Sequence, residues 1–312
     1  MAENYDNSIL RMTHVGRATA NEVAGKVMEL LPIRKLSLPV NGFPEGEGKH
    51  VICCNLGLKD VWDRFSKFQV GMAAYTWYSG NALSSFLLLA RIARLLWGIN
   101  FYGVQEMNYK GLTEFKDKRL SSYTSQLKYV LNPNEFVFFG ENVYSMTEGE
   151  VVKVYNGAQD MISRDYHNAG VRTNDEELYG NHIVIRYNYV DYFYGCLMRF
   201  STSRWKVGDK VKPGDLLGKV GCSGRLARRP YLHIHSRLST IHANIPLISW
   251  LFDQESVEVP LPMLKFENFY NFPIINPTRN TAHMIDEMKN SEIKYTYNGG
   301  SLLFPGMMIR KI

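Results

Sequence analysis

Two histidines stand two residues apart in the stretch "RRPYLHIHSRL", residues 229–239. The stretch reads as a strand, in which alternate side chains point to the same face. His233 and His235 can therefore reach one site. Imidazole carries protons near neutral pH and is a common zinc ligand. The pair predicts a metal or proton-transfer site whose other ligands come from elsewhere in the chain.

Further side chains on neighbouring β-rich segments could complete such a site. Cys196 would give three zinc-competent groups together with the two histidines, and His182 or His167 would add a fourth. Each has an ordinary structural interpretation as well. A free cysteine often packs as a small buried hydrophobe. His182 opens a strand, where a hydrogen-bonded structural role is common, and His167 lies in a polar segment open to water.

Three arginines precede the histidine pair in "SGRLARRPYLHIH", namely Arg225, Arg228 and Arg229. Guanidinium groups bind carboxylate or phosphate oxygens through two parallel hydrogen bonds. These residues predict a subsite for an anionic ligand, and the alternative is a solvated basic loop.

Composition indicates a globular protein with a core of its own. The chain has 312 residues, of which 45% are hydrophobic, and a formal net charge of +6. This charge favours acidic partners but is small for a nucleic-acid binder, so none is expected. The four cysteines have no repeated spacing, and the N-terminal stretch shows no secretory signal. We therefore expect reduced thiols and a cytoplasmic location, with non-classical export as the alternative.

The pattern of residues changes along the chain. Residues 1–112 contain "ANEVAGKVMELL" and "LKDVWDRFSKF", whose apolar spacing predicts helices. Residues 113–275 consist of short β-rich runs separated by Gly, Asn, Asp and Pro. Residues 276–312 form a C-terminal extension. The predicted fold class is α+β: a mainly helical N-terminal region followed by an antiparallel β-sheet domain.

Residues 82–103, "ALSSFLLLARIARLLWGINFYG", form the most apolar segment. It predicts a buried or partner-facing helix, or one that lies in a membrane interface. Arg91 and Arg94 near its centre each cost about 2.5–3.5 kcal/mol in a bilayer, which disfavours a full span.

The stretch "WKVGDKVKPGDLLGKVG", residues 205–221, predicts tight turns between short strands. Two architectures share this alternation of apolar residues and Gly-containing turns: the lipoyl- or biotinyl-carrier sandwich and the β core of zinc peptidases of the lysostaphin type. The carrier needs a lysine displayed on a hairpin tip, and no such lysine follows.

Four segments in order favour the peptidase architecture. "ENVYSMTEGEVVKVYNG", "YGNHIVIRYNYVDYFYGCL", "KVGDKVKPGDLLGKVGCSG" and "PYLHIHSRL" together resemble the lysostaphin/LytM-like zinc metallopeptidases, which are peptidoglycan endopeptidases. The resemblance covers residues 125–270 and implies a LytM-like β domain with zinc as its cofactor. It implies that His235 is a zinc ligand and that His233 is the catalytic general acid or base.

The chain departs from the family at the remaining positions. Asn132 or Asn134 stands where the resemblance implies a ligand Asp, no His precedes it, and Cys196 replaces the His of a "Y-x-H-L" motif. An amide is a weak zinc ligand, so the predicted set of His235, Cys196 and Asn132 is incomplete.

Three functions remain open from the sequence. The favoured one is a degenerate, non-catalytic binding or regulatory module, whose partner is a peptide, a peptidoglycan-like ligand or a wall enzyme. The first alternative is an active zinc endopeptidase with a rebuilt metal site. The second is a membrane-associated toxin or effector that uses residues 82–103.

Overall fold

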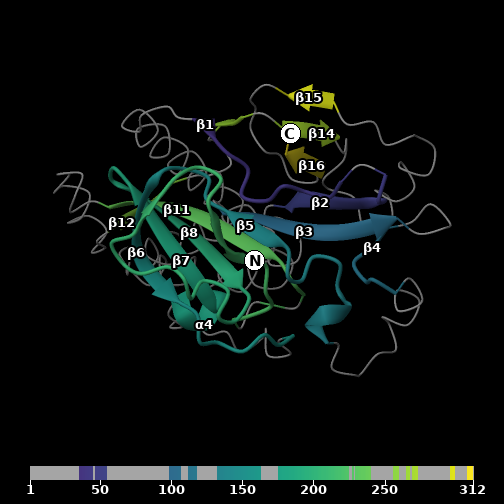
Figure 1. Cartoon of the computed structure of the whole chain (residues 1–312), viewed down its shortest axis with the longest axis horizontal. Coiled ribbons are helices and arrows are strands. Elements are labelled where there is room, and N and C mark those ends of the chain that lie inside the picture. Colours follow the sequence, from purple (N-terminus) through teal and green to yellow (C-terminus); the bar gives the residue numbers. More distant parts are fainter. Residues whose placement is uncertain are drawn as a thin grey trace, which may run out of the picture.

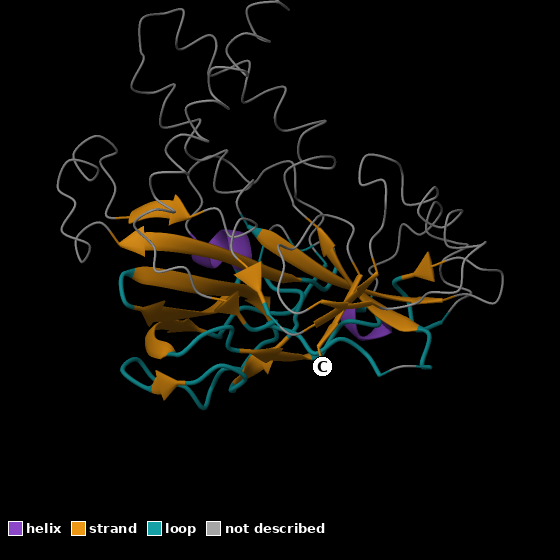
Figure 2. Cartoon of the chain, turned by 90° about the horizontal axis from the view of Figure 1, so that it is seen from above, coloured by secondary structure: helices purple, strands orange, loops and turns teal. Residues whose placement is uncertain are grey.

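An antiparallel β-sheet dominates the computed structural model (Figure 1, Figure 2). The structure describes residues 35–44, 46–54, 98–106, 112–117, 132–162, 175–224, 227, 229–239, 256–259, 265–267, 269–272, 296–298 and 308–311.

The described strands are short, and most lie in one sheet. Their bounds are β1 Lys35–Leu36, β2 Lys49–Cys54, β3 Ile99–Glu106, β4 Leu112–Thr113, β5 Asn142–Tyr144, β6 Gly149–Tyr155, β7 Asn181–Tyr187, β8 Val190–Leu197, β9 Lys210–Val211, β10 Leu216–Lys219, β11 Leu232–Ser239, β12 Ser256–Val259, β13 Lys265–Phe266, β14 Phe269–Phe272, β15 Thr296–Asn298 and β16 Met308–Lys311. The described helices are the 3-10 turn η3 (Pro133–Glu135) and α4 (Asp175–Tyr179).

The large sheet has twelve strands, and its main path runs β15-β14-β16-β2-β3-β11-β8-β7-β6-β9, with β12 beside β11 and β4 beside β3. Every pairing within it is antiparallel. The antiparallel part of the predicted fold class is therefore confirmed. Strands from 1–112, from 113–275 and from 276–312 all join this sheet, while the domain boundaries themselves stay a prediction.

The prediction of a mainly helical N-terminal region is wrong. The described residues before 113 form strands β1 to β4, and no described helix reaches seven residues. In β2 and β3 the sequences "KHVICC" and "INFYGVQE" are rich in β-branched and aromatic residues, which fit a pleated, buried surface. The two segments with helical spacing, 20–31 and 58–68, lie outside the described residues.

The predicted helix over 82–103 is corrected at its C-terminal end, where β3 begins at Ile99. Residues 82–97 lie outside the described part. Among the residues that the structure describes, no helix has the length and apolar character needed to cross a membrane.

Turn chemistry around β9 follows the sequence prediction. The carboxylate of Asp209 accepts a hydrogen bond from the backbone N–H of Lys206 at 2.8 Å, and Asp215 does the same for Lys212 at 2.8 Å. Such Asp-to-backbone bonds fix tight turns. The "GD" and "PGD" turns are thus confirmed.

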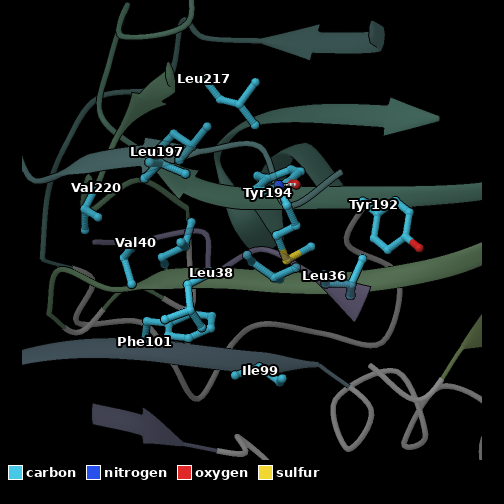
Figure 3. Packing of buried hydrophobic residues seen from close by; sticks show 14 of the residues in the cluster. Leu36, Leu38, Val40, Ile99, Phe101, Tyr192, Tyr194, Leu197, Leu217 and Val220 are labelled. Atoms are coloured by element: carbon cyan, nitrogen blue, oxygen red, sulfur yellow. Dashed lines mark hydrogen bonds between the residues drawn. The ribbon is translucent and has the colours of Figure 1, made fainter. Parts of the chain in front are cut away.

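The core lies against one face of the sheet (Figure 3). Leu36 and Leu38, at the end of β1 and just after it, pack with Phe101 of β3 and Tyr194 of β8, and all four side chains are at most 1% exposed. The buried Tyr194 hydroxyl accepts a hydrogen bond from the backbone N–H of Met146 at 2.8 Å. The segment that follows β1 therefore packs onto β3 and β8, the two strands that flank β11.

Candidate functional site

The two histidines lie at the middle of β11, between β8 and β3. His233 stands opposite Gly195 of β8 and Asn100 of β3, while His235 stands opposite Phe193 of β8. Cross-strand neighbours on one face have side chains within contact distance. The register therefore brings both imidazoles to one face of the sheet, as their spacing predicts.

A chain of hydrogen bonds joins the two rings to Asn100. Nδ1 of His233 lies 2.8 Å from Oδ1 of Asn100, and Nε2 of His233 lies 2.9 Å from Nδ1 of His235. Because an amide oxygen only accepts, His233 donates from Nδ1 and accepts at Nε2 from the Nδ1–H of His235. Three of the four ring nitrogens are therefore engaged within this chain.

Aromatic rings cover the pair. Tyr179 of α4 stacks on His233 with ring centroids 4.4 Å apart and planes 5° apart, and Phe193 stacks on His235 at 4.4 Å and 17°. His233 is 0% exposed and His235 is 2% exposed. The pair is thus enclosed, without access to bulk water.

The row of rings continues across the sheet. His182 of β7 stacks on Phe193 at 4.7 Å, and Tyr155 of β6 stacks on His182 at 5.7 Å. His182 Nδ1 also lies 2.8 Å from the backbone oxygen of Gly180. His182 is therefore part of the same packed row, separated from His235 by the ring of Phe193.

Tight backbone contacts fix the end of α4. A Cβ on Gly180, where φ is +61°, would meet the backbone nitrogen of Gly224 at 2.4 Å, and a Cβ on Gly224, where φ is +90°, would meet Gly180 at 2.6 Å. Only glycine combines this conformation with so close an approach. The next residue, Asn181, accepts from the N–H of Ala158 at 2.7 Å and donates to the oxygen of Leu197 at 3.1 Å. Tyr179 is therefore held in place by the chain on either side of the site.

Cys196 lies in a different cluster. Its side chain is 0% exposed and packs with Cys222, Ala227 and Tyr231. Burial raises the pKa of the Cys196 thiol to about 12. The thiol is therefore protonated near neutral pH, whereas the metal-binding form is the thiolate.

Two further predicted residues lie apart from the histidines. The side-chain oxygen of Asn132 accepts a hydrogen bond from the backbone N–H of Asn134 at 3.0 Å, which caps η3, and its side chain is exposed. Arg229 forms an ion pair with Glu114, and its guanidinium lies 5.0 Å from the ring centre of Tyr102. Arg225, Arg228 and His167 lie outside the described residues.

The described residues do not fit a catalytic zinc ion. Among them, no three His, Cys, Asp or Glu side chains gather closely enough to hold a metal. A catalytic zinc needs three protein ligands and an open position for water or substrate. The roles of His235, Cys196 and Asn132 as ligands, and of His233 as the acid or base, stay predictions.

The sequence did not point to Asn100 or Tyr179. Asn100 falls in the segment expected to be helical, so its place opposite His233 could not be inferred. Tyr179 follows a polar stretch, and only the motif "YGN" marks a turn there. The alternation of "VDYFYGCL" did carry a signal for Phe193, since every second residue faces the same side.

Residues 136–245 match the model for Peptidase family M23. Over this segment the chain is similar to peptidase family M23. The segment contains β5 to β11 and hence the histidine pair. The comparison with curated proteins gives no match.

Solved structures of several peptidases are similar over part of the chain. A putative peptidase M23 from Pseudomonas aeruginosa is 22% identical, over 33% of this chain and 35% of that one, with a TM-score of 0.23. A putative glycyl-glycine endopeptidase LytM from Ruminococcus gnavus is 26% identical over 32% and 34%, with a TM-score of 0.22. The catalytic domain of lysostaphin from Staphylococcus simulans is 19% identical over 50% and 77%, with a TM-score of 0.25. The chain thus spans about a third of the first two proteins.

Proposed function

We propose that this protein is a non-hydrolytic binding or regulatory module. The observation that carries the proposal is the direct bond between Nε2 of His233 and Nδ1 of His235, 2.9 Å long and enclosed by aromatic rings. A ring nitrogen that donates or accepts in this chain does not coordinate a metal at the same time. Nε2 of His235 is the one ring nitrogen of the pair outside the chain, and one nitrogen is too few for a catalytic zinc, which needs three protein ligands.

The burial of the histidine pair also argues against hydrolysis, because a peptide substrate could not reach the two imidazoles. Metal-assisted peptide hydrolysis requires a water molecule and a carbonyl oxygen beside the ion. Tyr179 and Phe193 are 3% and 2% exposed and lie directly on the two imidazoles. A scissile carbonyl would have to displace rings that are packed into the core.

The partners that fit this role are the ones that the family resemblance implies. They are a peptide or peptidoglycan-like ligand, or a wall enzyme that the module regulates. Because the histidine face is closed, binding would use exposed surface of the domain instead of the ancestral catalytic position.

An endopeptidase assay tests the proposal. The full chain is incubated with purified peptidoglycan and added zinc, and newly released amino groups are measured, with an active M23 endopeptidase as positive control. We expect release no faster than in buffer, and the same result for His233→Ala. Release that is rapid in the wild-type chain and lost in His233→Ala would refute the proposal.

A further inference from the structure

Exposed cations and apolar side chains lie between the end of β8 and the turn that follows β9, at one edge of the large sheet. We call this surface the edge face. It consists of Arg199, Phe200, Arg204, Lys206, Val207 and Lys212.

The edge face follows β6 from one end to the other. The N–H of Phe200 donates to the oxygen of Asn156 at 3.1 Å, and the N–H of Gly208 donates to the oxygen of Val151 at 2.8 Å. Val151 and Asn156, the residue just after β6, are five positions apart in the chain, which in extended backbone is about 17 Å. Phe200 and Val207 therefore stand at two turns on one edge, at opposite ends of it.

Both apolar side chains at these turns are unusually exposed. Phe200 is 57% exposed and Val207 is 67% exposed. Phe200 has a φ of 59°, a left-handed backbone conformation that glycine and, to a lesser degree, Asn and Asp tolerate but that costs free energy for a bulky residue. The guanidinium of Arg199 lies 4.5 Å from the centre of the Phe200 ring. A cation thus stands beside an apolar side chain that faces water.

The lysines of the edge face are available to an anionic partner. Asp209 and Asp215, the nearest acids in the sequence, accept hydrogen bonds from the backbone N–H groups of Lys206 and Lys212. Within the described residues, neither of these two ammonium groups has a carboxylate at ion-pair distance. Lys210, by contrast, pairs with Glu150.

Edge protection and nucleic-acid binding each account for only part of this surface. Lysines at a sheet edge discourage strand addition by another chain, but an exposed Phe and Val would have the opposite effect. Single-stranded nucleic acid binds basic surfaces with aromatic rings on which bases stack, but Val207, the most exposed apolar residue of the edge face, offers no ring.

We propose that the edge face docks on an anionic membrane surface. Phe200 and Val207 would enter the interface between headgroups and acyl chains, while Arg199, Arg204, Lys206 and Lys212 face the anionic headgroups. This combination of protruding apolar tips and flanking cations is what interfacial binding requires. The inference goes beyond the non-hydrolytic role and holds whether or not the domain cuts peptides.

Vesicle co-sedimentation of the full chain tests the inference. The vesicles contain phosphatidylcholine with or without phosphatidylglycerol. We expect binding to the anionic vesicles only, and weaker binding as salt rises, because ions screen the attraction. The double variant Lys206→Gln/Lys212→Gln should bind at least about tenfold more weakly.

Two further variants separate charge and apolar contributions. Lys49→Gln/Lys116→Gln removes the same charge from two lysines outside the edge face and should bind as the wild type does. Phe200→Asn/Val207→Ser keeps all cations and should also lose about tenfold or more, with an unchanged circular dichroism spectrum; Asn tolerates the backbone at position 200. The inference is overturned by absent binding to anionic vesicles, by equal losses in the two lysine variants, or by preferential binding to a single-stranded oligonucleotide.

Discussion

Tyr179 lies flat on His233, with ring centroids 4.4 Å apart and ring planes 5° apart. The same tyrosine tilts over His235 at 5.4 Å and meets the edge of Phe193 at 5.4 Å. A single side chain from a five-residue helix therefore contacts both imidazoles and the phenylalanine beside them. Its packing explains why the pair is a closed hydrogen-bonded unit.

Removing the Tyr179 ring should destabilise the domain strongly. Tyr179→Ala leaves a cavity over both imidazoles, and we expect the free energy of unfolding in urea to fall by about 3–5 kcal/mol. Tyr179→Phe retains the ring and should change it by less than about 1 kcal/mol. An Ala variant as stable as the Phe variant would show that the stacking contributes little.

The close contact between Gly180 and Gly224 gives a second prediction. Gly180→Ala would place a Cβ 2.4 Å from the backbone of the facing loop in a left-handed conformation, so we expect a loss of about 3 kcal/mol or more. Gly157→Ala is the matched control, since a Cβ there meets nothing within 4 Å. Thermal unfolding of both variants measures the difference, and similar midpoints would contradict the described position of α4.

Asn100→Ala should also weaken the fold, because it removes the acceptor for the buried Nδ1–H of His233. A buried donor without its acceptor costs about 1–3 kcal/mol. Asn142→Ala, at an exposed position, should cost less than about 0.5 kcal/mol. Urea unfolding of the two variants side by side checks this; equal stabilities would mean that Asn100 does not hold the pair.

The buried thiol of Cys196 makes stability fall in alkali. Burial raises its pKa to about 12 in the folded chain, whereas an unfolded cysteine titrates near about 8.5. Above about pH 8.5 the unfolded state loses the proton that the folded state keeps. The stability that the buried, protonated thiol contributes is therefore complete below about pH 8.5 and declines as pH rises toward 12.

Comparison with Cys196→Ala isolates this contribution. Between about pH 8 and pH 10 the wild type should lose about 2 kcal/mol more stability than Cys196→Ala. Cys222 remains in both proteins; its pKa is raised by burial first and by Cys196 second, so the same pair is also compared in a Cys222→Ala background. Parallel losses in the two proteins would mean that the Cys196 thiol ionises as readily in the folded chain as in the unfolded one.

The sequence predicted the β domain well because its signals are local. Period-two alternation and the Asp-containing turns near Lys206 and Lys212 depend only on neighbouring residues, and the structure reproduces them. The spacing of His233 and His235 fixed their common face for the same reason.

The rest depended on contacts between distant parts of the chain. Asn100 contacts His233, which is 133 positions away in the sequence. The apolar segment that contains Asn100 predicted a helix, in which Asn100 would not pair with β11. Likewise, β-branched residues in β2 became strand because β3 and β16 pair with it. The spacing of apolar residues within one segment does not show which distant strand that segment pairs with.

The zinc content of the purified full chain is the most direct test of the claim that the histidine pair is not a metal centre. After incubation with zinc and removal of the excess, we expect far less than one zinc per chain, and the same value for His235→Ala. Close to one zinc per chain in the wild type, lost in His235→Ala, would contradict that claim.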